Sequence, residues 1–151
     1  MKKNQPTKTA FAKYQPDTKK RVKIQSSKSP ESAAKKKPIW NLKLFDLEGP
    51  WGVCKINKAS TLEEIRIKLS NYSTMTWAQI EGDLNHSIEI SSCIKKAQKR
   101  LIDLQLDDIS NLFSFRFSGK KRLYGKKQNE IFFPVWWDPD HEICPSKLKH
   151  T

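Results

Sequence analysis

Arginine, tyrosine and histidine side chains recur between residues 112 and 146 at spacings that a small sheet could bring together. Arg116 and Arg122 are six residues apart, Tyr124 follows, and His141 comes after an Asp-Pro pair that ends an apolar run. A histidine with a pKa near neutral can act as a general acid or base, and fixed cations can bind a phosphate and stabilise its charge. We therefore take His141 as the candidate acid or base, the arginines as phosphate ligands and Tyr124 as an aid to base binding or proton transfer.

Each of these residues also has an ordinary structural explanation. A histidine after a turn can cap that turn, strand arginines can form salt bridges, here with Glu130 or Asp138, and a tyrosine suits the boundary of a sheet. The other two histidines are weaker candidates, because His86 lies in a predicted loop and His150 lies at the end of the chain.

Period-two alternation predicts that a meander of three antiparallel strands carries the candidates. Phenylalanines alternate with polar residues over 113–118, and further strands are expected over 122–125 and 131–136. Gly and Asn in the intervening segments favour three-residue loops at 119–121 and 127–129. With those loops, Arg116 pairs with Tyr124, and Tyr124 pairs with Phe132.

This register gives the sheet a core face and a second face that mixes cations with aromatic rings. The core face carries Phe113, Phe115, Phe117, Leu123, Ile131, Phe133 and Val135. The second face carries Ser114, Arg116, Ser118, Arg122, Tyr124, Phe132, Pro134 and Trp136. Cations bind phosphates and exposed rings stack on unpaired bases, so this face predicts RNA binding. Alternatively, Phe132 and Trp136 lie beneath the N-terminal strand or a loop, and only the arginine end of the face is exposed.

Lysines in the two turns extend the predicted basic surface. Lys120 and Lys121 occupy the first turn, and Lys126 and Lys127 lie at the start of the second. They either bind nucleic acid or are ordinary turn lysines.

The first 37 residues form a basic tail. They hold 12 Lys or Arg and 2 Asp or Glu, a balance of +10 within a chain total of +13. Its dense points are Lys19, Lys20 and Arg21, and then Lys35, Lys36 and Lys37. Isolated apolar residues cannot form a core, so we expect residues 1–37 to be disordered. The tail is either a nucleic-acid-binding arm or a solubilising segment.

Residues 38–151 are expected to form one α+β domain, with two or three helices packed on one side of a small antiparallel sheet. A strand is predicted over 39–47, and helices over 60–70, 77–81 and 94–104. Capping boxes, Ser60 with Glu63 and Thr76 with Gln79, mark two of the helix starts. In the predicted core, Phe115, Phe117, Leu123 and Phe133 pack against Ile65, Leu69, Leu101 and Leu104. Trp51 and Trp77 are also assigned to the core, and one ring of the pair Trp136 and Trp137 is expected to point outward.

The cysteines favour a reducing compartment. Cys54, Cys93 and Cys144 are far apart in the sequence and form neither a disulfide pattern nor metal-ligand spacing. The N-terminal lysines are followed by no apolar run, so no signal peptide is predicted, and no stretch predicts a membrane span. We expect a cytoplasmic protein with no metal or other cofactor.

The stretch LFSFRFSGKKRLYGKKQNEIFFPVWWDPDHEI, preceded by helices, resembles the RelE/ParE-like toxin superfamily. The matching features are an Arg-bearing strand with Arg116, a second strand with Arg122 and Tyr124, an apolar strand over 131–135, and His141 near the end. The ending WWDPDHEICPS also resembles a group of small, mostly uncharacterised bacterial proteins. Glu142 departs from the superfamily pattern, in which an arginine often follows the histidine.

The resemblance implies an RNase-like α+β fold and a bacterial toxin that is held inactive by a cognate antitoxin. The RelE branch cleaves messenger RNA on the ribosome without a metal, and the ParE branch inhibits DNA gyrase. Three functions follow as expectations. The first is a RelE-like endoribonuclease, the second is a nucleic-acid-binding protein without catalysis, and the third is a protein-directed inhibitor on the same scaffold.

Overall fold

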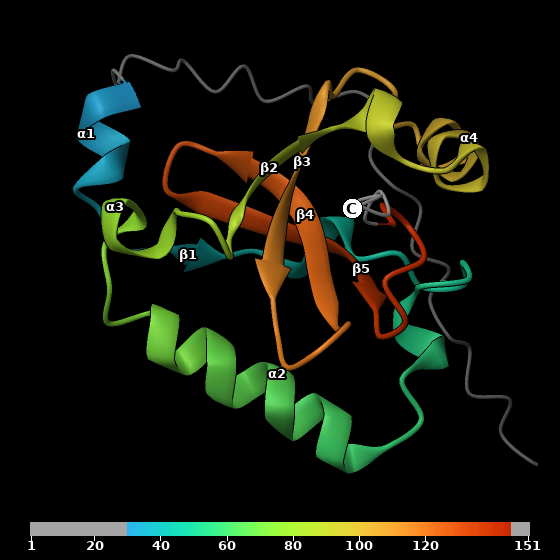
Figure 1. Cartoon of the computed structure of the whole chain (residues 1–151), viewed down its shortest axis with the longest axis horizontal. Coiled ribbons are helices and arrows are strands. Elements are labelled where there is room, and N and C mark those ends of the chain that lie inside the picture. The colour runs from blue at the N-terminus through green and yellow to red at the C-terminus, as the bar shows by residue number, and fades with distance from the viewer. Residues whose placement is uncertain (1–29, 146–151) are drawn as a thin grey trace, which may run out of the picture.

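A five-stranded mixed sheet forms the centre of the protein (Figure 1). The computed structural model describes residues 30–145. The strands are β1 (Ile39–Trp40), β2 (His86–Glu89), β3 (Asn111–Arg116), β4 (Arg122–Gln128) and β5 (Ile131–Asp138), in the order β1-β5-β4-β3-β2. The contact of β1 with β5 is parallel and the other pairings are antiparallel. The α+β class is confirmed, and the sheet is wider than the predicted meander.

Helices cover both faces of this sheet, so the prediction of helices on one side is wrong. They are α1 (Pro30–Ala34), α2 (Ala59–Tyr72), α3 (Trp77–Ile80) and α4 (Lys95–Asp103), with short 3-10 turns η1 (Leu42–Leu44), η2 (Val53–Lys55) and η3 (Ile90–Ser92). In Figure 1 the sheet lies between α2 and α4. None of the helices in residues 30–145 has the length and apolarity that a bilayer crossing requires.

An aromatic core lies between the sheet and the helices α2 and α3. Phe113, Phe115 and Phe117 alternate along β3 and its end, and all three are buried, as predicted. Trp77, also fully buried, meets the rings of Phe113 and Phe115 with centroids 5.4 and 5.9 Å apart. The predicted capping box that starts α3 is confirmed, with Thr76 as the N-cap.

A second core lies between the sheet and α4. Leu101 of α4 packs there with Leu112, Tyr124 and Trp136, together with Trp51 from the segment after β1. Leu101 and Leu104 therefore do not meet Phe115, because α4 and α2 lie on opposite faces. Covering both faces buries Trp136 and Trp137 together, which the prediction of one outward ring did not anticipate.

The strand register of the meander differs from the prediction, but the two faces of β3 and β4 do not. Arg116 pairs with Arg122 rather than Tyr124, a change of two residues in the pairing. Side chains alternate with a period of two, so a shift of two residues leaves the same residues on each face. Phe115 and Leu123 accordingly share the core face, as predicted.

A bulge in β5 changes the faces of that strand. Tyr124 pairs with Trp136 and Gly125 with Pro134, which leaves Val135 as an extra residue. Phe132 consequently lies on the α2 face and Trp136 on the α4 face. Phe132 covers Gly125 so closely that a Cβ there would lie 2.5 Å from its ring.

Regular structure begins before Pro38, where the domain was predicted to start, and the first strand is shorter than predicted. Helix α1 begins at Pro30, and the Lys36 carbonyl accepts a hydrogen bond of 2.9 Å from the Trp77 backbone N–H. The predicted disorder is therefore wrong for residues 30–37, and the rest of the tail lies outside the described residues. The predicted strand over 39–47 stops at Trp40, because Asn41 caps the turn η1.

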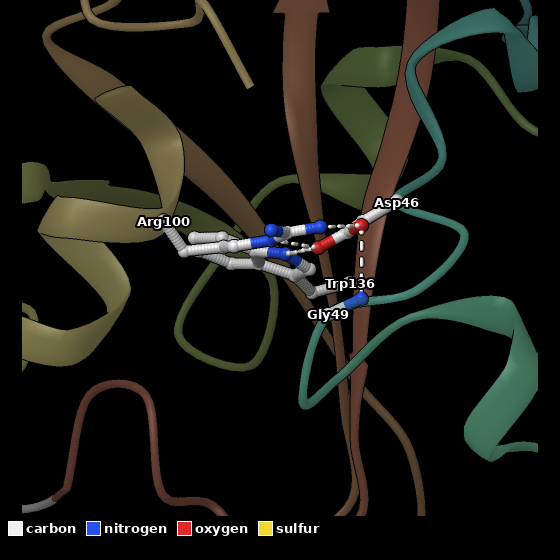
Figure 2. Close-up of polar contacts among 4 residues, drawn as sticks. All are labelled: Asp46, Gly49, Arg100 and Trp136. Carbon is white, nitrogen blue, oxygen red and sulfur yellow. Dashed lines mark hydrogen bonds and ion pairs between the residues drawn. The ribbon is translucent and has the colours of Figure 1, made fainter. Parts of the chain in front are cut away.

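Asp46 joins this irregular segment to the rest of the domain (Figure 2). Its buried carboxylate accepts hydrogen bonds from Arg100 Nε and Nη2 of α4 at 2.9 and 2.7 Å, and from Trp136 Nε1 of β5 at 3.1 Å. The backbone N–H of Gly49 donates a fourth bond of 3.1 Å. Burial alone raises the pKa of Asp46, but these donors outweigh burial and hold the pKa below its ordinary value.

Replacing Asp46 by alanine should lower the free energy of unfolding by about 3–5 kcal/mol, because it leaves Arg100 and Trp136 without their acceptor. The loss is expected above the ordinary carboxyl pKa of 3.8 and should diminish as the pH falls through the lower pKa of the folded state. Urea unfolding across that range measures both effects. As a control, Glu63→Ala breaks an exposed ion pair with Arg66 and should leave stability nearly unchanged. Equal losses in the two variants would contradict the role given to Asp46.

Candidate active site

A cavity of about 370 Å³ opens on the α4 side of the sheet, and all four predicted catalytic residues line it. Arg116, Arg122 and Tyr124 come from the adjacent strands β3 and β4, and His141 comes from the segment after β5. The opposite wall includes His86 of β2. Residues chosen from their types and spacing are therefore brought together by the fold.

Two arginines form the floor of the cavity. Arg116 and Arg122 are directly opposite each other on neighbouring strands, a placement that like charges disfavour. Arg122 Nη1 donates to the carbonyls of Gly119 and Lys121 at 2.8 and 2.9 Å, which fixes its guanidinium. Burial, and next the charge of Arg116, lower the pKa of Arg122.

The predicted alternative, that these arginines are neutralised by salt bridges, is not what the structure shows. Within residues 30–145 no ion pair joins either arginine to an acidic side chain. Glu130 instead contacts Lys36 at 3.5 Å, at the end of β4 away from Arg122. Asp138 pairs with Arg122 in the strand register and its charge partly offsets the lowering of the Arg122 pKa by burial, but the two side chains form no ion pair. Two adjacent arginines without ion pairs suit the binding of an anion such as phosphate.

Tyr124 lies beneath the cavity in the α4-side core and is 1% exposed. Burial, with a smaller contribution from Asp138, raises the pKa of its hydroxyl. The hydroxyl therefore stays protonated near neutral pH and is poorly suited to act as a base. A ring buried to this extent cannot stack on a nucleobase, which removes one of its predicted roles.

His141 has left-handed backbone geometry with φ of 57°. The turn around it is held by Asp138, whose carboxylate accepts the backbone N–H groups of Glu142 and Ile143 at 3.0 and 2.9 Å. Asp138, rather than the histidine, is thus the capping group of the turn. Burial, and next the charge of Arg122, lower the pKa of His141. A neutral imidazole near neutral pH is a proton acceptor.

His86 lies in a strand rather than in the predicted loop. It opens β2 and pairs with Ser114 of β3, which in turn pairs with Tyr124. Its Nδ1 lies 3.3 Å from the Ser87 carbonyl, and the side chain is exposed at the cavity wall.

The predicted nucleic-acid-binding lysines are mostly engaged elsewhere. Lys120 is exposed, and its charge helps to lower the His141 pKa, so it belongs to the cavity region. Lys121 donates to Glu64 at 2.8 Å, and Lys127 pairs with Glu81 and lies over the Trp77 ring. Lys126 is half-buried and lines a smaller depression towards the other end of β4.

The tail lysines are not gathered at the cavity either. Lys35 and Lys37 are exposed, and Lys36 lies beside Glu130. Lys19, Lys20 and Arg21 lie outside the described residues.

Phe132 and Trp136 cannot contact nucleic acid, and that prediction is wrong. Each has no exposed surface, and the bulge at Val135 places them on opposite faces of the sheet. The expected surface of cations interleaved with exposed rings does not exist in the described part of the chain. What remains is a compact cationic cavity flanked by imidazoles.

In residues 30–145 no group of three or more His, Cys, Asp or Glu side chains is arranged to hold a metal ion. No family model, curated protein or solved structure matches this chain. The resemblance to RelE/ParE-like toxins therefore stays a prediction, and the case for function depends on the cavity itself.

We predict that Arg122→Gln raises the pKa of His141, because the substitution removes a cation whose charge disfavours the imidazolium. Titration of the imidazole signals by NMR measures the change. In the wild type, His141 should titrate below its ordinary value of 6.5. Lys99→Gln removes an exposed cation from α4. It is the matched control and should leave the His141 pKa unchanged. A His141 pKa that is the same in Arg122→Gln and wild type would contradict the proposed electrostatics of the cavity.

Proposed function

We propose that this protein is a metal-independent endoribonuclease, a RelE-like toxin that cuts messenger RNA and is neutralised by a cognate antitoxin. One observation carries the proposal: His141, Arg116, Arg122 and Tyr124 line one cavity, although the pattern that selected them took no account of α4 or β2. A cavity of about 370 Å³ falls in the range of small-molecule sites and has room for a nucleotide unit.

The chemistry assigned to each residue follows from its surroundings. The paired guanidinium groups of Arg116 and Arg122 hold the scissile phosphate and stabilise the added charge of its pentavalent state. His141, neutral because burial and Arg122 lower its pKa, takes the proton of the 2′-hydroxyl. Tyr124, protonated because burial raises its pKa, donates to a phosphate oxygen. The need for a 2′-hydroxyl makes RNA, and not DNA, the substrate.

The alternative of nucleic-acid binding without catalysis loses its main support. It relied on exposed rings beside the arginines, and Phe132 and Trp136 are both buried. The alternative of a protein-directed inhibitor has no specific observation in its favour among the described residues. RNA cleavage is therefore the function that the cavity supports best.

The purified full chain should cleave an unstructured RNA in the presence of EDTA and leave the matching DNA intact. The double variant Arg116→Ala/Arg122→Ala should lose about 10²-fold or more in rate, the cost of removing a fixed donor to a developing charge. Lys95→Ala/Lys99→Ala removes two exposed cations from α4 and serves as the charge-matched control. Cleavage is followed on a labelled oligonucleotide, with folding checked by circular dichroism. A folded double variant that cleaves like the control would remove this cavity from the mechanism.

Expression in bacteria should arrest growth for the wild type and not for His141→Ala, because the toxin role requires the cleavage chemistry. Colony counts after induction measure the effect, with equal protein levels confirmed by immunoblot. Growth arrest that persists unchanged in a folded His141→Ala variant would instead support a protein-directed inhibitor.

A further inference from the structure

His86 has no role in the function proposed so far, although it lines the same cavity as His141. It is exposed, and within residues 30–145 its one polar contact is the Nδ1 contact of 3.3 Å with the adjacent Ser87 carbonyl. No packing or ion-pair duty explains an imidazole at this position.

The strand order places the two imidazoles on opposite sides of the arginine pair. β2 carries His86 and borders β3 with Arg116, which borders β4 with Arg122, and β5 leads from Asp138 to His141. His86 pairs with Ser114, two residues along β3 from Arg116, and His141 follows Asp138, which pairs with Arg122. In the order of the strands, a phosphate bound at the arginines would therefore have one histidine on each side. The cavity wall contributed by β2 thus faces the wall contributed by the segment after β5.

Opposite placement matters because phosphodiester cleavage by a 2′-hydroxyl is an in-line displacement. The attacking 2′-oxygen and the departing 5′-oxygen lie on opposite sides of phosphorus, so the base and the acid must also lie on opposite sides. His141 has a lowered pKa and suits the base. The acid must then come from the other wall.

Resting on the proposed function, we propose that His86 is the second proton-transfer group of this cavity, the acid that protonates the departing 5′-oxygen. The 2′-oxygen gives its proton to His141 and forms a bond to phosphorus, and the bond from phosphorus to the 5′-oxygen breaks. The proton on His86 Nε2 passes to that oxygen. The products are a 2′,3′-cyclic phosphate and a free 5′-hydroxyl, and the overall reaction consumes no other reagent.

The local contacts of His86 are consistent with this role. With Nδ1 donating to the Ser87 carbonyl, Nε2 has no protein partner among residues 30–145 and is the nitrogen left for proton transfer. The other acidic hydrogens at the cavity are poorly suited, because burial raises the pKa of both the Tyr124 hydroxyl and the Cys144 thiol. Asp83 is on the same wall as His86 and is the competing candidate that the experiment must separate.

A substrate whose 5′-bridging oxygen is replaced by sulfur provides the test, because a thiolate departs without being protonated. The full-length wild type should cleave both the oxygen and the sulfur dinucleotide. His86→Ala should slow cleavage of the oxygen substrate by about 10²- to 10⁴-fold and leave cleavage of the sulfur substrate close to wild type. His141→Ala should slow both. A merely structural role for His86 would slow both substrates and would not produce this selective rescue.

Two matched variants complete the design. Ser87→Ala changes the neighbouring exposed residue, whose side chain is on the other face of β2, and should behave as wild type. Asp83→Asn should also cleave the oxygen substrate normally, and selective rescue of that variant instead would overturn the assignment to His86. Unchanged or unrescued activity in His86→Ala would overturn it while leaving the endoribonuclease intact. A wild type that cleaves neither substrate would overturn both proposals.

Discussion

The buried carboxylate of Asp46 is the interaction on which the α4 half of the domain depends. It binds a helix through Arg100, a central strand through Trp136 and its own loop through Gly49, at distances of 2.7–3.1 Å. A buried charge costs several kcal/mol unless its partners are complete, so this network tolerates little rearrangement. Gly49 is constrained by the same packing, because a Cβ at that position would overlap the Asp46 carboxylate.

Fixing α4 in this way determines what is left open on that face of the sheet. Leu101 and Trp51 cover the part of the sheet around Trp136 and Leu112, and both faces of the centre become core. The ends of β3 and β4 carrying Arg116 and Arg122 line the open cavity beyond this core. The cavity is thus the part of the α4-side face that no helix covers. Its walls are formed by the edge strand β2 and by the turn that Asp138 caps.

Sequence reasoning identified the floor of the site and missed its surroundings, for physical reasons that differ from residue to residue. Arg116, Arg122 and Tyr124 were assigned to one face because alternation survives an error of two residues in register. Phe132 was assigned to the wrong face because the bulge at Val135 leaves no mark in an apolar run. Trp136 lies on the predicted face but is buried there in a core with Trp51 and Leu101. The apolar stripe of α4 predicts that the helix packs on the sheet, but it does not indicate which face of the sheet the helix covers.

Several locally unfavourable features meet at the cavity. Arg116 and Arg122 repel each other across a strand pair, His141 adopts a left-handed conformation, and burial raises the pKa of Asp138 despite two backbone donors. Each feature is locally unfavourable, although the Asp138 carboxylate also holds the turn that leads Ile143 into the α4-side core. Local costs that persist together are typical of sites retained for binding or catalysis. Two arginines on adjacent strands are stabilised when an anion binds between them, and in the function proposed above that anion is a phosphodiester, which would also meet the flanking imidazoles.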